Sequence, residues 1–128
     1  MAALSNYLEN ALINAVLRNV SYTSPATVYV ALFTTDPTDA GSGTEVSGGS
    51  YARTAVTFGA PTNGVASNSG AVNFPTSSGV WGTVTHVGIY DTSTAGNLLF
   101  HGVLTVSKTV GNGDTVTFAI GALSATLQ

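Results

Sequence analysis

The sequence contains no cysteine, so neither a disulfide framework nor a thiolate metal site is available to it. Charge is also scarce, because only 7% of the 128 residues are charged, against about 25% in ordinary soluble domains. The net charge of −3 offers no electrostatic attraction to nucleic acid or to an anionic membrane surface. The sequence has no apolar run near the ~18 residues of a membrane span, and its N-terminus lacks the basic segment of a secretion signal. We therefore expect a protein that is soluble when made and has neither nucleic acid nor membrane as a partner.

Hydroxyl side chains replace the missing charge. Ser and Thr together supply roughly a quarter of the residues and must form much of the hydrophilic surface. Hydroxyl groups cost far less to bury than ammonium or carboxylate groups, so such a surface is easily desolvated. Composition therefore allows two interpretations equally: a protein that works packed against copies or partners, or a soluble β-domain with a Thr-rich exterior.

Apolar residues recur at helical spacing near the N-terminus and predict one helix over residues 3–19. Asn6 followed by Glu9 is a possible N-cap pair, although an earlier start is equally allowed. Ile13 and Leu17 fall on the opposite side from the main apolar stripe, either as ordinary exposed residues or as a contact with a neighbouring subunit. The stripe itself is expected to close one end or face of a sheet, and it contains Leu4, Leu8, Ala11, Leu12, Ala15 and Val16, extended by Tyr7.

The strongest structural signal is the segment from Trp81 to Val106. Residues 84–90 alternate with a period of two, and Asp91–Asn97 supplies a turn to a second run at 98–106. This second run is apolar on both faces, so we expect it to be covered on both sides. It is then an interior strand, or a strand whose outer face meets another subunit. One of its faces is expected to carry Leu98, Phe100, Leu104 and Val106.

Five further strands are expected, at residues 27–35, 51–58, 65–74, 115–120 and 123–127. The first of these is apolar on both faces as well, so it should also be covered on both sides. Short strands separated by turn residues are typical of a sandwich or a barrel. We predict a mainly β protein, an antiparallel β-sandwich of about seven strands with one N-terminal α-helix.

The length of the chain and the absence of repeats or linkers predict a single domain. This domain would comprise residues 1–128, with the helix at 3–19 and the β-sandwich at 26–128.

The longest irregular stretch, Asp36–Ser50, is long enough to be functional or mobile. Thr38 and Ala40 stand where a calcium-binding loop requires acidic or amide oxygens, and neither a lysine nor a helix follows the glycines of the stretch as in a phosphate-binding loop. His86 and His101 lie on strands that should pair, but no third metal ligand and no nucleophile motif accompanies them. We therefore predict no catalytic residue, no metal site and no cofactor, and hydrogen-bonding roles for both histidines.

Several strings of the sequence carry a family resemblance: PATVYVALFTTDPTDAG, TEVSGGSYARTAVTFGAP, VNFP, WGTVTHVGIYD and GNLLFHG. Together they resemble a family of small virion structural proteins of tailed bacteriophages and prophages, and the similarity covers nearly the whole chain. The resemblance implies a non-enzymatic protein of the virion, made in the cytoplasm of the bacterial host. Its partners would be copies of itself and either the major capsid protein or tail proteins of the same phage.

The family includes both capsid decoration and tail proteins, so the location within the particle is a separate question. A fibre shaft usually shows repeats or a coiled coil, and this sequence has neither, which favours a capsid cement or decoration protein. The alternative is a tail or tail-fibre-associated structural or adsorption protein whose loop 36–50 is exposed and binds a host-surface glycan. For either role, the residues expected at interfaces are Tyr7, Ile13, Leu17, Tyr29, Phe33 and Trp81.

Overall fold

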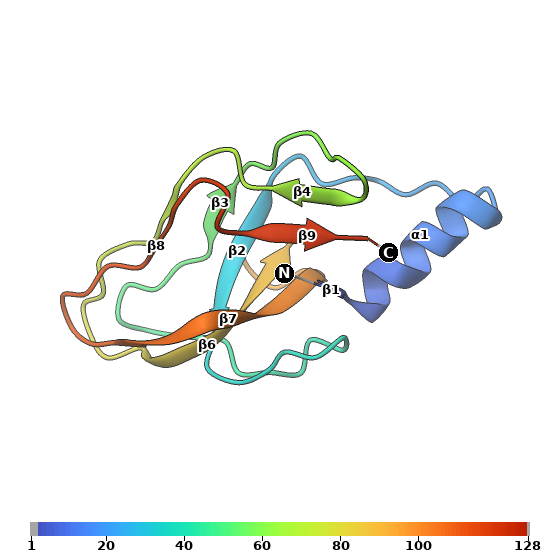
Figure 1. Cartoon of the computed structure of the whole chain (residues 1–128). Coiled ribbons are helices and arrows are strands. Elements are labelled where there is room, and N and C mark those ends of the chain that lie inside the picture. The colour runs from blue at the N-terminus through green and yellow to red at the C-terminus, as the bar shows by residue number, and fades with distance from the viewer. Residues whose placement is uncertain (1–2, 128) are drawn as a thin grey trace.

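The computed structural model describes residues 3–127 of the chain. Within this range the protein is mainly antiparallel β-structure with a single helix near the N-terminus, as predicted (Figure 1). The elements in chain order are β1 (Ala3–Leu4), α1 (Asn6–Leu17), β2 (Val28–Phe33), β3 (Thr54–Val56), β4 (Val65–Ser67), β5 (Val72–Asn73), β6 (Gly82–Tyr90), β7 (Leu98–Val110), β8 (Thr117–Phe118) and β9 (Ser124–Thr126).

The strands form two layers. A five-stranded sheet has the order β1-β7-β6-β2-β3, and the second layer consists of two ribbons, β4-β9 and β5-β8 (Figure 1). Alternate residues of the sheet pack against residues of both ribbons in one hydrophobic core, as expected for a sandwich. This core includes Val30 and Leu32 of β2, Val87 and Ile89 of β6, Val72 of β5, Val116 just before β8 and Leu123 just before β9.

The outer face of the sheet carries a second, smaller hydrophobic cluster, formed by Ala31, Phe33, Tyr90 and Leu98. The rings of Phe33 and Tyr90 stack with their centroids 6.3 Å apart. The loop after β2 folds back over this face, since a Cβ on Gly41 would lie 3.7 Å from the side chain of Leu98. Strand β2 is therefore covered on both sides, as its sequence predicted, and the cover on its outer face is the chain's own loop.

Strand β7 contains a bulge that changes which residues share a face. Tyr90 pairs with Leu98 and Ile89 pairs with Phe100, so Leu99 is an extra residue in β7. Leu98 therefore joins the outer cluster, whereas Phe100 packs against the main core. The prediction that these two residues share a face is wrong, because an inserted residue reverses the alternation.

The distal half of β7 is also different from the prediction. A second irregularity separates the pairs Val84–Lys108 and His86–Val103, so the strand departs from regular pairing there. Val103 and Val106 are exposed to solvent. The expectation that this strand is covered on both sides is confirmed at Leu98 and Leu99 and is wrong beyond residue 102.

Helix α1 begins later and ends earlier than predicted. Ser5, with φ −77° and ψ 162°, is the N-cap, and its hydroxyl accepts a hydrogen bond from the backbone N–H of Leu8. The possible cap at Asn6 is therefore wrong, since Asn6 is already helical. Residues 3 and 4 form strand β1 beside β7 and do not belong to the helix.

The helix packs less closely than an amphipathic pattern implies. Leu8 is the only buried residue among those of α1, and Val16 of the predicted stripe is 77% exposed. The reason is geometric: the helix is attached to the sheet at its N-terminal end and projects away from the sandwich (Figure 1). The stripe therefore closes no face of the sheet beyond its first turns.

Candidate assembly surface

The attachment of α1 to the sandwich depends on Ser5, which is almost completely buried. Its backbone N–H donates to the carbonyl of Leu99 at 2.8 Å, and its hydroxyl donates to the carbonyl of Leu98. The next residue, Asn6, donates its N–H to the carbonyl of Asp39 at 2.9 Å. These bonds fix the start of the helix to β7 and to the loop after β2, and so determine the direction in which the helix projects.

The C-terminal half of α1 and Val20, three residues beyond its end, present an apolar surface to solvent. We call this surface the helix face and define it as Ile13, Val16, Leu17 and Val20, all of which are exposed. No charged residue occurs between Glu9 and Arg18, and the guanidinium of Arg18 donates back to the side chain of Asn14 at 2.9 Å. Burying a Val, Leu or Ile side chain contributes about 1.5–3 kcal/mol, so leaving four of them in water is unfavourable. Clustered exposed apolar residues of this kind mark interaction sites.

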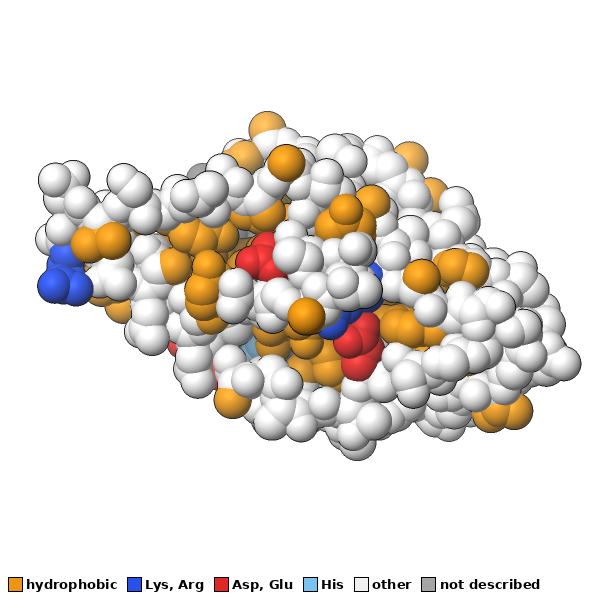
Figure 2. All heavy atoms as spheres, turned by 180° about the vertical axis from the view of Figure 1, so that it is seen from behind, with side chains coloured by type: hydrophobic (Ala, Val, Ile, Leu, Met, Phe, Trp, Pro, Cys, Tyr) orange, Lys and Arg blue, Asp and Glu red, His pale blue; other side chains and the backbone are white. Residues whose placement is uncertain are grey.

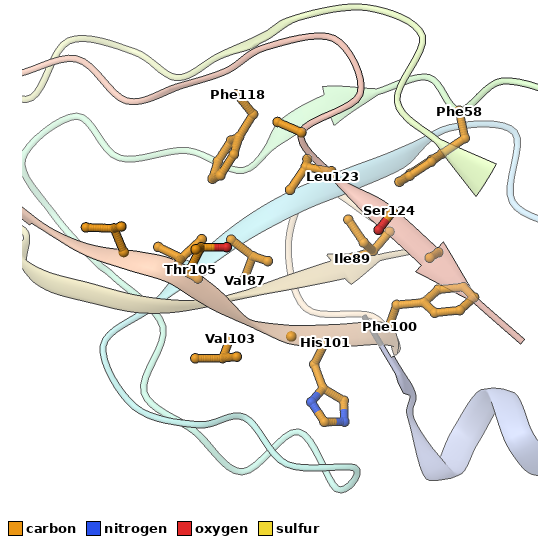
Figure 3. Close-up of a pocket in the computed structure, with 15 residues that line it drawn as sticks. Phe58, Val87, Ile89, Phe100, His101, Val103, Thr105, Phe118, Leu123 and Ser124 are labelled. Atoms are coloured by element: carbon orange, nitrogen blue, oxygen red, sulfur yellow. The ribbon is translucent and has the colours of Figure 1, made fainter. Parts of the chain in front are cut away.

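A second apolar feature is a groove between the sheet and the β4-β9 ribbon. We call it the apolar groove; its volume is about 650 Å³, and Phe58, Ile89, Leu99, Phe100 and Leu127 are among the residues that line it. A smaller pocket of about 230 Å³ continues from it along β7. In Figure 3, which shows this pocket, the side chains of Ile89 and Leu123 lie between β7 and β9, Phe58 lies on the side of β9 toward β4, and His101 points to the other side of β7.

The surface around these features carries little charge. Seen from behind, most of the molecule is covered by uncharged polar side chains and backbone, interrupted by separate apolar areas and a few charged groups (Figure 2). Such a surface is desolvated at low cost when it meets another protein.

One charged network joins the loop after β2, the residues before β3 and the turn between β6 and β7. Arg53, 8% exposed at its side chain, binds both carboxylate oxygens of Glu45 at 2.9 and 2.8 Å. Its other amino group donates to the carbonyls of Thr92 and Ala95, and its guanidinium carbon lies 3.6 Å from the centre of the Tyr90 ring. Burial opposes the charge on Arg53, but the hydrogen bond and the attraction of Glu45 outweigh it, so the pKa of the guanidinium is raised.

Tyr51 extends this network into the core. Its hydroxyl donates to Glu45 at 2.7 Å and accepts from the backbone N–H of Leu32 at 3.0 Å. Burial and the hydrogen bond to Glu45 raise the pKa of this phenol far above its usual range. The ring of Trp81 meets that of Tyr51 edge-on at 5.4 Å, and its indole N–H donates to the carbonyl of Gly49 at 2.9 Å. Each of these polar groups has a hydrogen-bond partner within the chain, so the network stabilises the fold.

The six residues predicted at interfaces divide into three groups by exposure. Tyr7, Ile13 and Leu17 lie on α1 and are exposed, with Leu17 76% exposed. Tyr29 is half-buried on β2, opposite Tyr90 and Ala55. Phe33 and Trp81 are 1% and 5% exposed, because the loop after β2 and the Tyr51 network cover them. Their side chains contact the chain's own core, and we do not include them in the assembly surface.

The histidines have separate local partners. His86 shares a hydrogen bond with Thr85 at 2.8 Å, and His101 meets the carboxylate of Asp39 at 2.6 Å. Strand register places His101 opposite Gly88, two residues from His86. Within residues 3–127, no three His, Asp or Glu side chains are grouped so that they could hold a metal ion.

Loop 36–50 is held by backbone bonds to β2, including Val46 N–H to the carbonyl of Leu32 at 2.9 Å. Asp36 accepts from Thr38, Asp39 meets His101, and Glu45 binds Arg53. The acidic side chains of the loop are therefore engaged within the chain. Of the segments that the structure describes, none is a helix long and apolar enough to cross a bilayer.

Comparison with known proteins gives the chain a family. A comparison with curated proteins finds no match. A family described as Podophage GP4 fiber I protein gp80 matches residues 3–126, which is almost the whole chain and includes both α1 and the sandwich. The match agrees with the resemblance to tailed-phage virion proteins that the strand and turn sequences carry. The chain therefore belongs to the podophage GP4 fiber I protein gp80 family, a family of phage virion structural proteins.

Proposed function

We propose that this protein is a non-enzymatic structural component of a phage fibre, joined to neighbouring virion proteins through the exposed helix face. The observation that carries the proposal is the match of residues 3–126 to a fibre protein family. The exposed apolar residues of α1 support it, because a surface of this kind is unfavourable in water and favourable in an assembly.

The family description favours the fibre-associated alternative over the capsid cement role that the absence of repeats suggested. The absence of repeats counts only against a fibre shaft, which needs length. A compact domain suits an attachment point, a joint between subunits or a tip, and each of these requires an interface without requiring a repeat. Glycan binding by loop 36–50 gains no support from its acidic side chains, which are bonded within the chain.

Location and copy number in the particle test the fibre role. We expect antibody labelling of purified virions to mark the fibres, and quantitative mass spectrometry to find a small number of copies per particle. Labelling spread over the head, with hundreds of copies per virion, would instead establish the capsid cement role.

The helix face is tested separately with the double variant Ile13→Asp and Leu17→Asp. Charge at these positions makes burial in an interface costly, so we expect incorporation into particles to fall at least tenfold while the circular dichroism spectrum of the purified chain stays unchanged. Asn10→Asp, an exposed change on the same helix, is the matched control and should be incorporated normally. Normal incorporation of the double variant would remove the helix face from the proposal.

A further inference from the structure

Residues 3–127 carry two apolar features of opposite shape. The helix face projects from the sandwich (Figure 1), and the apolar groove is recessed between its layers. No residue of α1 is among those that line the groove. The hydrogen bonds of Ser5 to β7 direct the helix away from the sheet, so α1 does not fill the groove of its own chain.

From these features we propose that the helix face of one copy seats in the apolar groove of a second copy. The inference rests on the proposed function, since it names the partner of the helix face. Each copy then donates a helix and accepts one, and in a two-fold dimer the two reciprocal contacts form a single isologous interface.

The charges of the two surfaces fit this pairing. Residues 10–17 of the helix are uncharged, and so are all the described residues that line the groove. Joining them removes apolar area from water without moving an ion out of water, which is the costly step in burying a charged surface. Asn63 at the groove supplies a polar group near the rim.

A helix also suits the groove better than a strand as occupant. In α1 the backbone N–H groups after the first turn are bonded within the helix, and in the last turn the carbonyl of Asn14 accepts from the N–H groups of Arg18 and Val20. Few backbone groups of the helix therefore need partners in an apolar site. A strand has a row of unpaired N–H and C=O groups that would need an edge to bind.

The area that one contact buries explains why the assembly should close. Burial of one aliphatic side chain removes roughly 60–120 Å² from water, so the four side chains of the helix face bury about 350 Å² on the helix and one contact buries about 700 Å² in total. Stable interfaces bury about 1,200–2,000 Å² in total, so one contact is too small. Two contacts per copy, as in a reciprocal dimer, reach about 1,400 Å², which falls in the stable range.

Because the chain has no cysteine, single introduced cysteines give an unambiguous test. Leu17→Cys lies on the helix face, and Leu127→Cys lies at the rim of the groove. Under mild oxidation we expect a mixture of the two variants to form disulfide-linked dimers in more than half of the protein, whereas each variant alone remains mostly uncrosslinked. Leu17→Cys mixed with Asn112→Cys, an exposed position in the turn after β7, is the matched control and should give only background.

Two results would overturn the inference. Efficient crosslinking of Leu17→Cys by itself would show a helix-to-helix contact, and background crosslinking in the Leu17–Leu127 mixture would show that the groove receives no helix. The second result, with the unmodified chain monomeric by analytical ultracentrifugation, leaves the fibre role to be judged by antibody labelling and copy number in virions, and the helix face by the incorporation of the Ile13→Asp and Leu17→Asp double variant. Failure of the self-association and failure of the proposed function are therefore separable.

Charge variants provide an independent measurement in solution. We expect the unmodified chain to have the mass of the assembly, and each of the variants Leu17→Asp and Leu127→Asp to have the mass of a monomer. A mixture of the two retains one intact helix face and one intact groove, so dimers should reappear at high concentration. A mixture that stays monomeric at every concentration contradicts the proposed pairing.

Discussion

Trp81 and Leu17 belong to two regions that are stabilised in different ways. Around Trp81, an aromatic edge contact, an indole hydrogen bond and the ion pair of Glu45 and Arg53 connect the loop after β2, the residues just before β3 and the hairpin turn. Around Leu17, the helix makes only its own backbone bonds and exposes apolar side chains. The first region is specified by contacts within the chain. The second exposes apolar side chains of the kind that normally form a core, as is expected of a subunit whose surface packs against a neighbour.

Truncating Trp81 should have the largest effect on stability. Trp81→Ala removes a buried ring and its hydrogen bond to Gly49, so we expect the free energy of unfolding to fall by about 3–5 kcal/mol. Urea denaturation followed by circular dichroism measures this change. Val80→Ala, at the exposed neighbouring position, is the control and should change stability little. A loss below 1 kcal/mol for Trp81→Ala would contradict the placement of the ring in the core.

The ion pair comes next in size. Glu45→Gln leaves the mostly buried guanidinium of Arg53 without a charged partner and weakens the bond from Tyr51, so we expect a loss of about 1.5–3 kcal/mol. Glu9→Gln, on the exposed side of α1, is the charge-matched control and should be nearly neutral. Equal effects of the two variants in urea denaturation would mean that the Glu45 pair contributes no more than a surface charge.

Alkaline pH tests the same region through Tyr51. Its pKa is higher in the folded chain than in the unfolded chain, where a tyrosine titrates near about 10. The stabilising contribution is therefore complete below pH ~10 and is lost as the pH rises above that value, by up to about 1.4 kcal/mol per pH unit per tyrosine. Tyr90 shifts in the same direction, mainly through burial. Urea titrations above pH 10 should show a shallower loss for Tyr51→Phe than for the unmodified chain, and identical slopes would contradict this assignment.

Ser5 lies at the boundary between the two regions, so its substitution should affect one region and spare the other. Ser5→Ala removes the cap of α1 and the bond to the carbonyl of Leu98, with an expected loss of about 1–2 kcal/mol. Hydrogen exchange should quicken in α1 and remain slow in β2 and β6. Asn6→Ala is the informative control: it should be nearly neutral, and a larger effect there would make Asn6 the true cap.

The strands were predictable because their alternation is local. The covered faces of β2 and the hairpin of β6 and β7 follow from a period of two in the sequence. The bulge at Leu99 was not predictable, since residues 98–100 are all apolar and the pattern does not reveal an extra residue. The sequence also does not distinguish Ser5 from Asn6 as the N-cap, because both residue types cap helices well. Ser5 is selected by its hydrogen bonds to the carbonyls of Leu98 and Leu99, which are distant in the sequence.

The candidate surface was predictable only in part. Ile13 and Leu17 stand among asparagines, which distinguishes them from the stripe, and both are exposed. Val16 was assigned to the stripe because helical spacing does not show where a helix leaves the sheet. Phe33 and Trp81 were expected at interfaces as large aromatics, but folding of the loop after β2 buries the first and the Tyr51 network buries the second. The groove depends on how two layers meet, which no local pattern contains.

Substitution of the helix face should have the smallest effect on the stability of the isolated chain. Val16→Ser with Leu17→Ser removes no contact to the sandwich, so at dilution, where the chain is monomeric, we expect the free energy of unfolding to change by no more than about 0.5 kcal/mol. At high concentration the unmodified chain should gain stability from association while the variant does not, because binding to the folded state alone shifts unfolding by mass action. Urea midpoints measured over a hundredfold range of concentration separate the two contributions. A large loss at dilution would place Val16 and Leu17 in the domain's own core and remove the contrast with Trp81.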